Sequence, residues 1–427
     1  MFRKIVKVFI PRGLFLKVEP VGHLGEAILF NLVNGFPGRR FKIIGITGTN
    51  GKTTTCFLVH SMLHQAGYKV GLMTTVAYGV GDDIKPQTVH MTNVPVPLMM
   101  KRLKYLKRQG AEWLVMETTS MALAQNRVWG VPFSLAAMTN ISQDHLDYHK
   151  TMDNYIAAKV KLFRLANHNK KGLRTGVVNA DDVTASRFAS AVAHTITYGI
   201  KGGDIKAKDI KLSAKGLQYK ALAGKDEYHI KSSLPGKFNV YNTLAAVGVG
   251  RVLGLSREQI EQGIAELQGV AGRMTPIEAG QKFNVLVDFA HSPDALQNVL
   301  TAAKELTTGK VILVFGATGD RDKAKRPIMG QIAVANADLI YLTDDETYTE
   351  DPGQIIKDVY KGIEAANGQS KTTIIEDRLE AIKAAFAAAA TGDTVILAGI
   401  GHETTRNMGG KEVPWNEIQI AKKLLKK

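Results

Sequence analysis

The chain has 427 residues, enough for two or three domains. Hydrophobic residues make up 45% and charged residues 22%, as in ordinary globular proteins, and no apolar run reaches the roughly 18 residues of a membrane span. The one cysteine, Cys56, excludes an internal disulfide framework and fits a reducing compartment. Lys and Arg number 55 against 39 Asp and Glu, and the net charge of +16 favours anionic partners such as nucleotides, acidic metabolites, nucleic acid or a membrane surface.

The first 40 residues are basic and apolar by turns. They contain no uninterrupted apolar region followed by a small-residue cleavage site, so we expect no signal peptide. Residues 23–33 (HLGEAILFNLV) predict one amphipathic helix. That helix either caps the first domain or contacts a membrane surface or a partner helix.

From residue 41 onward, short apolar runs alternate with helical stretches. The predicted buried strands are residues 42–47, 113–117, 135–139, 176–178, 284–288, 311–315, 339–343 and 394–398, and the first helix covers residues 52–66. Strands separated by helices favour parallel α/β sheets. Residues 201–232 break this rhythm with loose Lys- and Gly-rich alternation and predict a small antiparallel meander on the first sheet. A domain boundary is expected near residues 269–273.

A candidate phosphate loop, GITGTNGKT at residues 45–53, lies between the first strand and the first helix. Its glycines let backbone N–H groups approach phosphate oxygens at a helix N-terminus. Lys52 would neutralise the β- and γ-phosphates, and the Thr53 hydroxyl would face Mg²⁺. The strict spacing places Gly at position 46, where this chain has Ile46, so we expect Gly45 and Gly48 to form the turn. No guanine-reading Asn-Lys-x-Asp motif follows, which disfavours a switch GTPase.

Further polar residues follow the next strands. Glu117 ends the run WLVME, where open α/β sheets bind ligands, and is a natural Mg²⁺ ligand. In NISQDHLDYH at residues 140–149, His145 is a candidate second Mg²⁺ ligand and His149 a structural hydrogen bonder. Zinc is disfavoured because the HExxH spacing is absent and no Cys is near. Lys159 lies on an amphipathic helix, and its spacing alone predicts a solvated lysine.

Together these segments resemble the Mur ligase family, and within it the tripeptide-forming branch that adds a diamino acid to UDP-N-acetylmuramoyl-dipeptide. The resemblance covers about residues 41–420 and rests on an ordered set of motifs: TGTNGKT at 47, METTSMALAQNRV at 116, TNISQDHLDYHKTMDNYIAAKVKLF at 139, NADD at 179, PGKFNVYNTLAA at 235, GR at 272, DFAHSPDAL at 288, FGATGDRDKAKRP at 315, EDP at 350 and GIGHE at 399. It implies an α/β fold, with a P-loop central ATPase domain that combines a parallel sheet and a small antiparallel meander, followed by a Rossmann-like C-terminal α/β domain.

The resemblance also implies an activity. Such ligases use ATP to convert a substrate carboxylate into an acyl phosphate, which the amine of an amino acid attacks, releasing ADP and phosphate. We therefore expect ATP and Mg²⁺ as cofactors, a UDP-muramoyl peptide and an amino acid as substrates, and a monomer in the cytoplasm that serves peptidoglycan synthesis without a nucleic acid partner. Weak membrane contact through the N-terminus stays open. The expected divisions are a short segment at 1–40, the central ATP-binding domain at 41–271 and the amino-acid-binding domain at 272–427.

The family's functional positions map onto this chain by motif. The catalytic group is expected to be Lys52, Glu117, His145 and Lys159. The nucleotide would contact Gly48, Asn50, Gly51, Lys52, Thr53, Asn239, Asn242, Arg273, Asp288 and His291. The metal would contact Thr53, Glu117, His145 and, if carbamylated as in this family, Lys159. The acceptor peptide would contact Thr92, Thr119, Gln125 and Arg127. The incoming amino acid would contact Arg321, Asp345, Glu346, Gly399 and Glu403.

Three features depart from the family pattern. Only about 45 residues precede the phosphate loop, so the uridine-binding domain is expected to be missing or reduced to a helix. The family's Asp-Asn-Pro-Arg motif for meso-diaminopimelate is replaced by DETY at residues 345–348. Because no arginine can pair with a distal carboxylate and Glu346 suits an ammonium, we expect L-lysine or a similar cationic donor in preference. Met121 replaces the usual His, without a functional account.

Two alternatives remain at this point. A Mur-type ligase could extend a lipid-linked or non-UDP cell-wall peptide, a reading that the basic, amphipathic N-terminus favours. A non-catalytic ATP-binding partner in a cell-wall complex is less favoured, because the catalytic group is complete. A folylpolyglutamate-type ligase is a weaker relative, since the segments from GDRDKAKRP to GIGHE favour the cell-wall branch.

Overall fold

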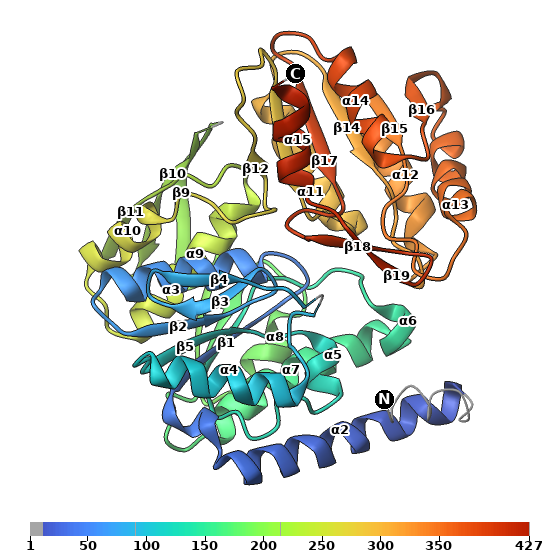
Figure 1. Cartoon of the computed structure of the whole chain (residues 1–427). Coiled ribbons are helices and arrows are strands. Elements are labelled where there is room, and N and C mark those ends of the chain that lie inside the picture. Colours follow the sequence, from blue (N-terminus) through green and yellow to red (C-terminus); the bar gives the residue numbers. More distant parts are fainter. Residues whose placement is uncertain (1–11, 90, 214, 427) are drawn as a thin grey trace.

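The computed structural model describes residues 12–89, 91–213 and 215–426 (Figure 1). Two α/β units follow each other along the chain. The first is built on an eleven-stranded sheet and the second on a six-stranded sheet, which stands above the first in Figure 1. This arrangement confirms the predicted fold class. The boundary at 271/272 stays a prediction, although the last strand of the first sheet and the first strand of the second lie on either side of it.

The first sheet has the order β11-β10-β9-β8-β7-β6-β1-β5-β2-β3-β4. Its parallel centre comprises β1 (Lys42–Thr47), β5 (Trp113–Glu117), β6 (Phe133–Met138), β7 (Thr175–Asn179), β8 (His194–Gly199) and β2 (Val70–Met73). One edge is the hairpin β3 (Ala77–Val80) and β4 (Asp83–Pro86). The other is the antiparallel meander β9 (Ile205–Ser213), β10 (Gly216–Ala223) and β11 (Asp226–Ser232), as predicted. The sequence analysis missed β2, β3, β4 and β8.

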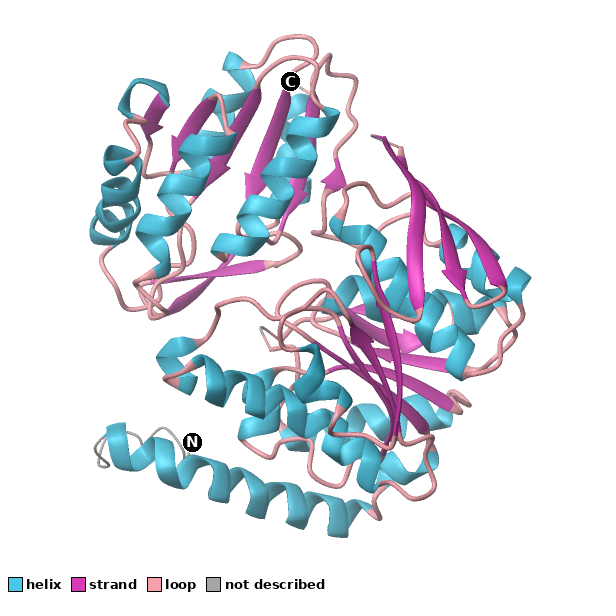
Figure 2. Cartoon of the chain, turned by 180° about the vertical axis from the view of Figure 1, so that it is seen from behind, coloured by secondary structure: helices cyan, strands magenta, loops and turns pink. Residues whose placement is uncertain are grey.

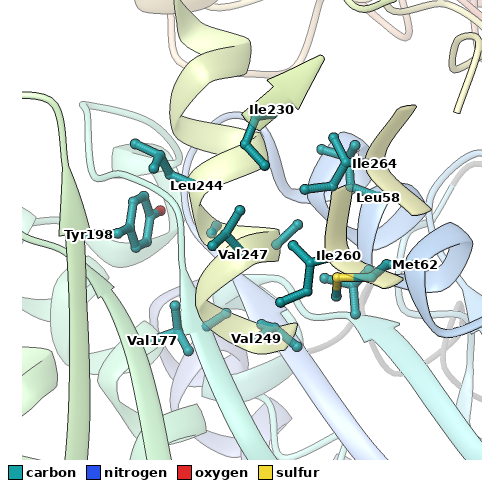
Figure 3. Packing of buried hydrophobic residues seen from close by; sticks show 14 of the residues in the cluster. Leu58, Met62, Val177, Tyr198, Ile230, Leu244, Val247, Val249, Ile260 and Ile264 are labelled. Carbon is teal, nitrogen blue, oxygen red and sulfur yellow. The ribbon is translucent and has the colours of Figure 1, made fainter. Parts of the chain in front are cut away.

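Helices cover both faces of this sheet. One face carries α3 (Lys52–Gln65), α9 (Phe238–Val252) and α10 (Arg257–Glu266), and the other carries α4 (Val96–Arg108), α5 (Ser120–Ala124) and α7 (Met152–His168). Figure 3 shows Met62 of α3 beside Ile260 of α10 in the first of these cores. A Cβ on Gly263 would lie 2.3 Å from the Cα of Met62, so only glycine permits this close approach of α10 to α3. The short helices α6 (Leu146–His149) and α8 (Ala185–Ala189) complete the unit.

The second sheet has the order β12-β13-β17-β14-β15-β16, and its strands are parallel except for β12. Its strands are β12 (Thr275–Pro276), β13 (Asn284–Asp288), β14 (Val311–Phe315), β15 (Leu339–Leu342), β16 (Thr372–Ile374) and β17 (Thr394–Ala398). Its helices are α11 (Pro293–Leu306), α12 (Lys325–Asn336), α13 (Pro352–Ala365), α14 (Arg378–Ala388) and α15 (Glu417–Leu425), and a hairpin, β18 (Thr405–Met408) and β19 (Lys411–Pro414), follows β17. Residues 288, 345 and 399 stand at or just beyond the carboxyl ends of β13, β15 and β17, where ligands bind in such sheets.

The N-terminal helix differs from the prediction. It is α2 (Arg12–Asn34), starts well before residue 23 and contains Pro20. An interior proline costs about 3 kcal/mol, but tertiary contacts offset this cost here. Asn126 donates its amide to the Pro20 carbonyl at 3.3 Å, and Gln125 donates to Glu19 at 3.2 Å. Within the described ranges, no helix is long and apolar enough to cross a bilayer. Predictions about residues 1–11 lie outside the described part of the chain.

Candidate active site

The phosphate loop connects β1 to α3, as the sequence predicts, and two of its glycines are sterically required. A Cβ on Gly48 would lie 1.8 Å from the Oγ1 of Thr139. Gly51 has φ 79°, and a Cβ there would lie 2.2 Å from the Oδ1 of Asn242. Any larger residue at either position would displace the loop backbone that faces the cavity.

The expected role of Gly45 in the turn is wrong. Gly45 lies inside β1, and a Cβ there would come within 2.7 Å of the side chains of Phe133 and Leu162. Its small size serves packing beneath the sheet, because the aromatic ring and the helix α7 lie against the strand. The loop turns at residues 48–51 instead.

Two lysine ammonium groups meet at this loop. The Nζ of Lys52 donates to the Thr49 carbonyl at 2.7 Å, and the Nζ of Lys159 donates to the Gly48 carbonyl at 2.6 Å. Lys159 is buried, so the solvated lysine that spacing alone predicts is wrong. Burial, followed by the positive charge of Lys52, holds the pKa of Lys159 well below its usual value. Burial also lowers the pKa of Lys52.

The carboxylate of Glu117 is hydrogen-bonded to the loop residue Thr53, which also contacts the second unit. Its Oε2 accepts hydrogen bonds from the Thr53 hydroxyl at 2.9 Å and from the Thr75 backbone N–H at 2.9 Å. Arg273, from the second unit, donates to the same Thr53 oxygen at 3.2 Å. Glu117 is 2% exposed, so this charged oxygen is held inside the protein by these donors.

Asp144 is a site residue that the sequence analysis missed. Its Oδ2 lies 3.5 Å from the Nε2 of His145, which caps α6 with φ 54°. Burial would raise the pKa of Asp144, but the positive charges of His145, His291 and Lys325 outweigh it and lower that pKa to about 2. Burial lowers the pKa of His145, against the attraction of Asp144. His149 contacts the Oγ of Ser120 at 3.0 Å, in a structural role.

A cavity of about 530 Å³ opens above the loop, between the two units. Its lining includes most of the residues predicted to contact nucleotide or metal: Asn50, Gly51, Lys52, Thr53, Glu117, His145, Asn239, Asn242, Arg273, Asp288 and His291. Gly48 in the loop and Lys159 behind it are not on the cavity wall. Burial raises the pKa of Asp288 to about 6, although Arg273 and two backbone N–H donors oppose it.

The predicted acceptor residues divide into two pairs. Thr92 and Thr119 line the larger cavity. Gln125 and Arg127 line neither of the two cavities described here: Gln125 donates to Glu19 of α2, and Arg127 donates to the Asn93 carbonyl. Nothing in the structure explains Met121, which lies on α5.

A smaller cavity of about 160 Å³ collects all the residues predicted to bind the incoming amino acid: Arg321, Asp345, Glu346, Gly399 and Glu403. Asp345 is 3% exposed, and its Oδ2 has no hydrogen-bond partner among the described residues. A Cβ on Gly399 would lie 2.1 Å from that oxygen, which requires glycine there. Burial, followed by the negative charge of Asp345, raises the pKa of Glu346 to about 7.

The two cavities adjoin, because five residues line both of them: Asp144, His145, Phe289, His291 and Glu403. Lys325 stands at this junction and donates to the His291 carbonyl at 2.8 Å. Asp294 also crosses between the units, since it accepts hydrogen bonds from Asn50 and, at 3.2 Å, from Ser142. The sequence analysis missed both residues.

Comparison with known proteins bears on this arrangement. Residues 46–250 match the model of the Mur ligase middle domain, and residues 272–401 match the Mur ligase, glutamate ligase domain. The chain is 40% identical over 392 residues to a UDP-N-acetylmuramoyl-L-alanyl-D-glutamate–2,6-diaminopimelate ligase of Caldanaerobacter subterraneus, covering 91% of this chain and 79% of the relative. The chain belongs to the Mur ligase family. Members of this family are ATP-dependent ligases that form amide bonds.

Other similarities agree with this assignment. The equally named ligase of Bacillus velezensis is 40% identical over 401 residues, 92% of this chain and 80% of the relative. A solved structure of a ligase of that name is 31% identical with a TM-score of 0.61, over 90% of this chain and 78% of that one. The MurF ligase of Thermotoga maritima in complex with ADP has a TM-score of 0.68 at 19% identity, over 93% of this chain and 83% of that one, which shows a shared fold.

Proposed function

We propose that this Mur ligase couples ATP cleavage to the addition of a cationic diamino acid, L-lysine or a close analogue, to UDP-N-acetylmuramoyl-L-alanyl-D-glutamate, a step of peptidoglycan synthesis. The observation that supports it most is that two cavities with different chemistry adjoin. The larger has a phosphate loop, and the smaller has a buried, unpaired carboxylate oxygen on Asp345. An acyl phosphate formed in the first cavity would meet an amine held in the second.

The residues of the larger cavity fit a nucleotide with Mg²⁺. Among the described residues no group of three or more His, Cys, Asp or Glu side chains is placed to hold a metal. Mg²⁺ suits such a site, because it commonly takes one or two protein oxygens and completes its shell with phosphates and water. The Thr53 hydroxyl and the Glu117 carboxylate, 2.9 Å apart, would supply those oxygens. Bound there, Mg²⁺ would neutralise charge on the phosphates.

Each chain residue then has a definite task. The ammonium of Lys52 faces the phosphate position and offsets its negative charge. Lys159, behind the loop, holds the Gly48 carbonyl, and as a carbamate it would become a further carboxylate ligand for the metal. Asp144 and His145 stand where the two cavities join. In the proposed reaction they would lie beside the carbon that the amine attacks.

The donor preference rests on the charges of the smaller cavity. Asp345 and Glu346 both line it, and the Oδ2 of Asp345, which has no hydrogen-bond partner among the described residues, is matched by an ammonium group. The one arginine on this wall, Arg321, stacks over Tyr348 at 4.8 Å and donates to its hydroxyl at 3.3 Å. These contacts favour a cation over the second carboxylate of meso-diaminopimelate, although the relatives named above are diaminopimelate ligases.

The proposal is tested by phosphate release from ATP with purified protein, the UDP-linked acceptor and a panel of amino acids. Release that requires both the acceptor and an amino acid supports the ligase, and release without either one contradicts it. Glu346→Gln should lower kcat/KM for L-lysine at least about tenfold and affect diaminopimelate less. Glu364→Gln changes an exposed carboxylate on α13, outside both cavities; it is the matched control and should leave both values unchanged.

A second acceptor class is favoured by one contact. Gln125, expected to grip the acceptor, instead donates to Glu19 of the chain's own helix α2. This contact is compatible with a lipid-linked or otherwise non-UDP peptide as acceptor. Equal turnover with and without the UDP group would support that class, and strict dependence on UDP would exclude it. We further propose a monomer that acts in the cytoplasm, with membrane contact confined to α2.

A further inference from the structure

Helix α2 presents a continuous apolar stripe to solvent. The exposed fractions of its large apolar side chains are 49% for Val18, 66% for Val21, 57% for Leu29, 61% for Leu32 and 74% for Val33. The only other exposed residues between positions 18 and 33 are two glycines, at 22 and 25. At 3.6 residues per turn these positions fall within about 120° of the helix surface, the width of an amphipathic face.

The acidic residues of this helix have partners away from the stripe. Glu19 accepts from Gln125, and Glu26 lies 3.7 Å from the Nδ1 of His23, which is buried. On the opposite side, Ala27 is fully buried and Asn31 donates to the Trp129 carbonyl at 3.0 Å. Figures 1 and 2 show α2 along the outer edge of the first unit, on the side away from the second unit. The stripe is therefore an outward surface without carboxylates.

Basic residues follow α2 in the chain. Arg39 and Arg40 are exposed just after α2, in the short helix η1 (Pro37–Arg40). In the sequence, residues 1–17 contain five Lys or Arg and no Asp or Glu. A second copy of this chain would have the same net charge of +16, which is unfavourable for pairing. An anionic lipid surface instead complements both the apolar stripe and this positive charge.

We propose that α2 is an interfacial helix that binds anionic membranes, with the stripe at the boundary of headgroups and acyl chains and with Arg39 and Arg40 available to lipid phosphates. Through Glu19 and Pro20, α2 holds the segment at residues 125–126. If the acceptor of the proposed ligase reaction contacts Gln125, as its sequence motif implies, membrane binding would bring the acceptor side of the enzyme close to the bilayer.

The test is flotation of the full chain with vesicles, without substrates, so that failure leaves the proposed ligase activity untouched. The protein should float with vesicles of phosphatidylglycerol and phosphatidylcholine in equal parts. It should bind far less to phosphatidylcholine alone or at high salt. The double variant Leu29→Glu, Leu32→Glu should lower partitioning at least about tenfold. Val183→Glu changes a side chain that is 97% exposed elsewhere and should bind as the wild type does.

Three results would overturn the proposal. The first is no flotation of the wild type with either vesicle. The second is equal flotation of the double variant, or of the single variant Val21→Glu, which alters the same stripe. The third is a dimer in analytical ultracentrifugation that the double variant converts to a monomer, since the stripe would then pair two copies. Unchanged melting temperatures would show that the variants are folded.

Discussion

The hydroxyl of Thr53 offers a sharp test of the catalytic geometry. This oxygen donates to Glu117, which is 2% exposed, and accepts from Arg273 at 3.2 Å. Thr53→Val keeps the shape of the side chain and removes both hydrogen bonds. A hydrogen bond to a charged group contributes about 1.5–3 kcal/mol, so the free energy of unfolding should fall by about 2 kcal/mol.

The effect on activity should be larger than the effect on stability, because the same oxygen is the proposed Mg²⁺ ligand. We expect kcat/KM for ATP to fall by at least about 100-fold, equivalent to about 2.7 kcal/mol, and higher Mg²⁺ to restore part of it. Thr53→Ser retains the hydroxyl and should restore most of the activity. The assay is phosphate release from ATP, measured for the wild type and both variants across a Mg²⁺ titration. A valine variant with the activity and Mg²⁺ dependence of the wild type would refute the reasoning.

Three further predictions concern buried charged groups. Because the pKa of Lys159 is lowered, its amine is more easily neutral and should react with CO₂ to form a carbamate, releasing a proton. Added bicarbonate should then raise the turnover of the wild type but not that of Lys159→Arg, and the absence of a bicarbonate effect on the wild type would count against carbamylation. Because the pKa of Asp288 is raised to about 6, its contribution to stability is present below about pH 4 and is lost as pH rises through 6. In urea unfolding, the free energy of unfolding of the wild type should fall by up to about 3 kcal/mol over that window relative to Asp288→Asn, and a difference that stays constant with pH would contradict this. Arg326 is fully buried between Glu350 and Asp358, so Arg326→Met should lower the free energy of unfolding by about 3–5 kcal/mol. Arg187→Met breaks an exposed ion pair and should lower it by under about 1 kcal/mol, and similar losses in the two variants would refute the distinction.

Much of the parallel framework is predictable from the sequence. The strands at 42–47, 113–117, 284–288, 311–315 and 394–398 have the predicted bounds, because fully buried strands are continuous apolar runs. The strands of the first sheet that were not predicted lack a long apolar run: β2, β3 and β4 have four residues each, and β8 is mostly half-exposed. The short strands β12, β16, β18 and β19 of the second unit were not predicted either. The length of α2 was missed because Pro20 predicts a helix break, which only tertiary contacts overcome.

The candidate site divides in the same way. The phosphate loop is predictable because its spacing and its place between strand and helix are local features. Asp144, Asp294 and Lys325 were missed because their importance comes from partners distant in the sequence. Asp294 accepts a hydrogen bond from Asn50 of the other unit, and Lys325 donates to the His291 carbonyl. The burial of Lys159 could not be predicted from its local sequence, because a lysine on an amphipathic helix is ordinarily solvated. It is buried only because α7 packs behind the loop.

The most direct test of the central claim is a competition between donors. Purified protein would be incubated with ATP, Mg²⁺ and UDP-N-acetylmuramoyl-L-alanyl-D-glutamate and with equal amounts of L-lysine and meso-diaminopimelate. The products would be identified and quantified by mass spectrometry. The charges around Asp345 and Glu346 predict that the lysine tripeptide predominates, with ADP formed in equal amount. A product containing only diaminopimelate would contradict the proposed donor, and ATP cleavage without any tripeptide would contradict the proposed ligase reaction itself.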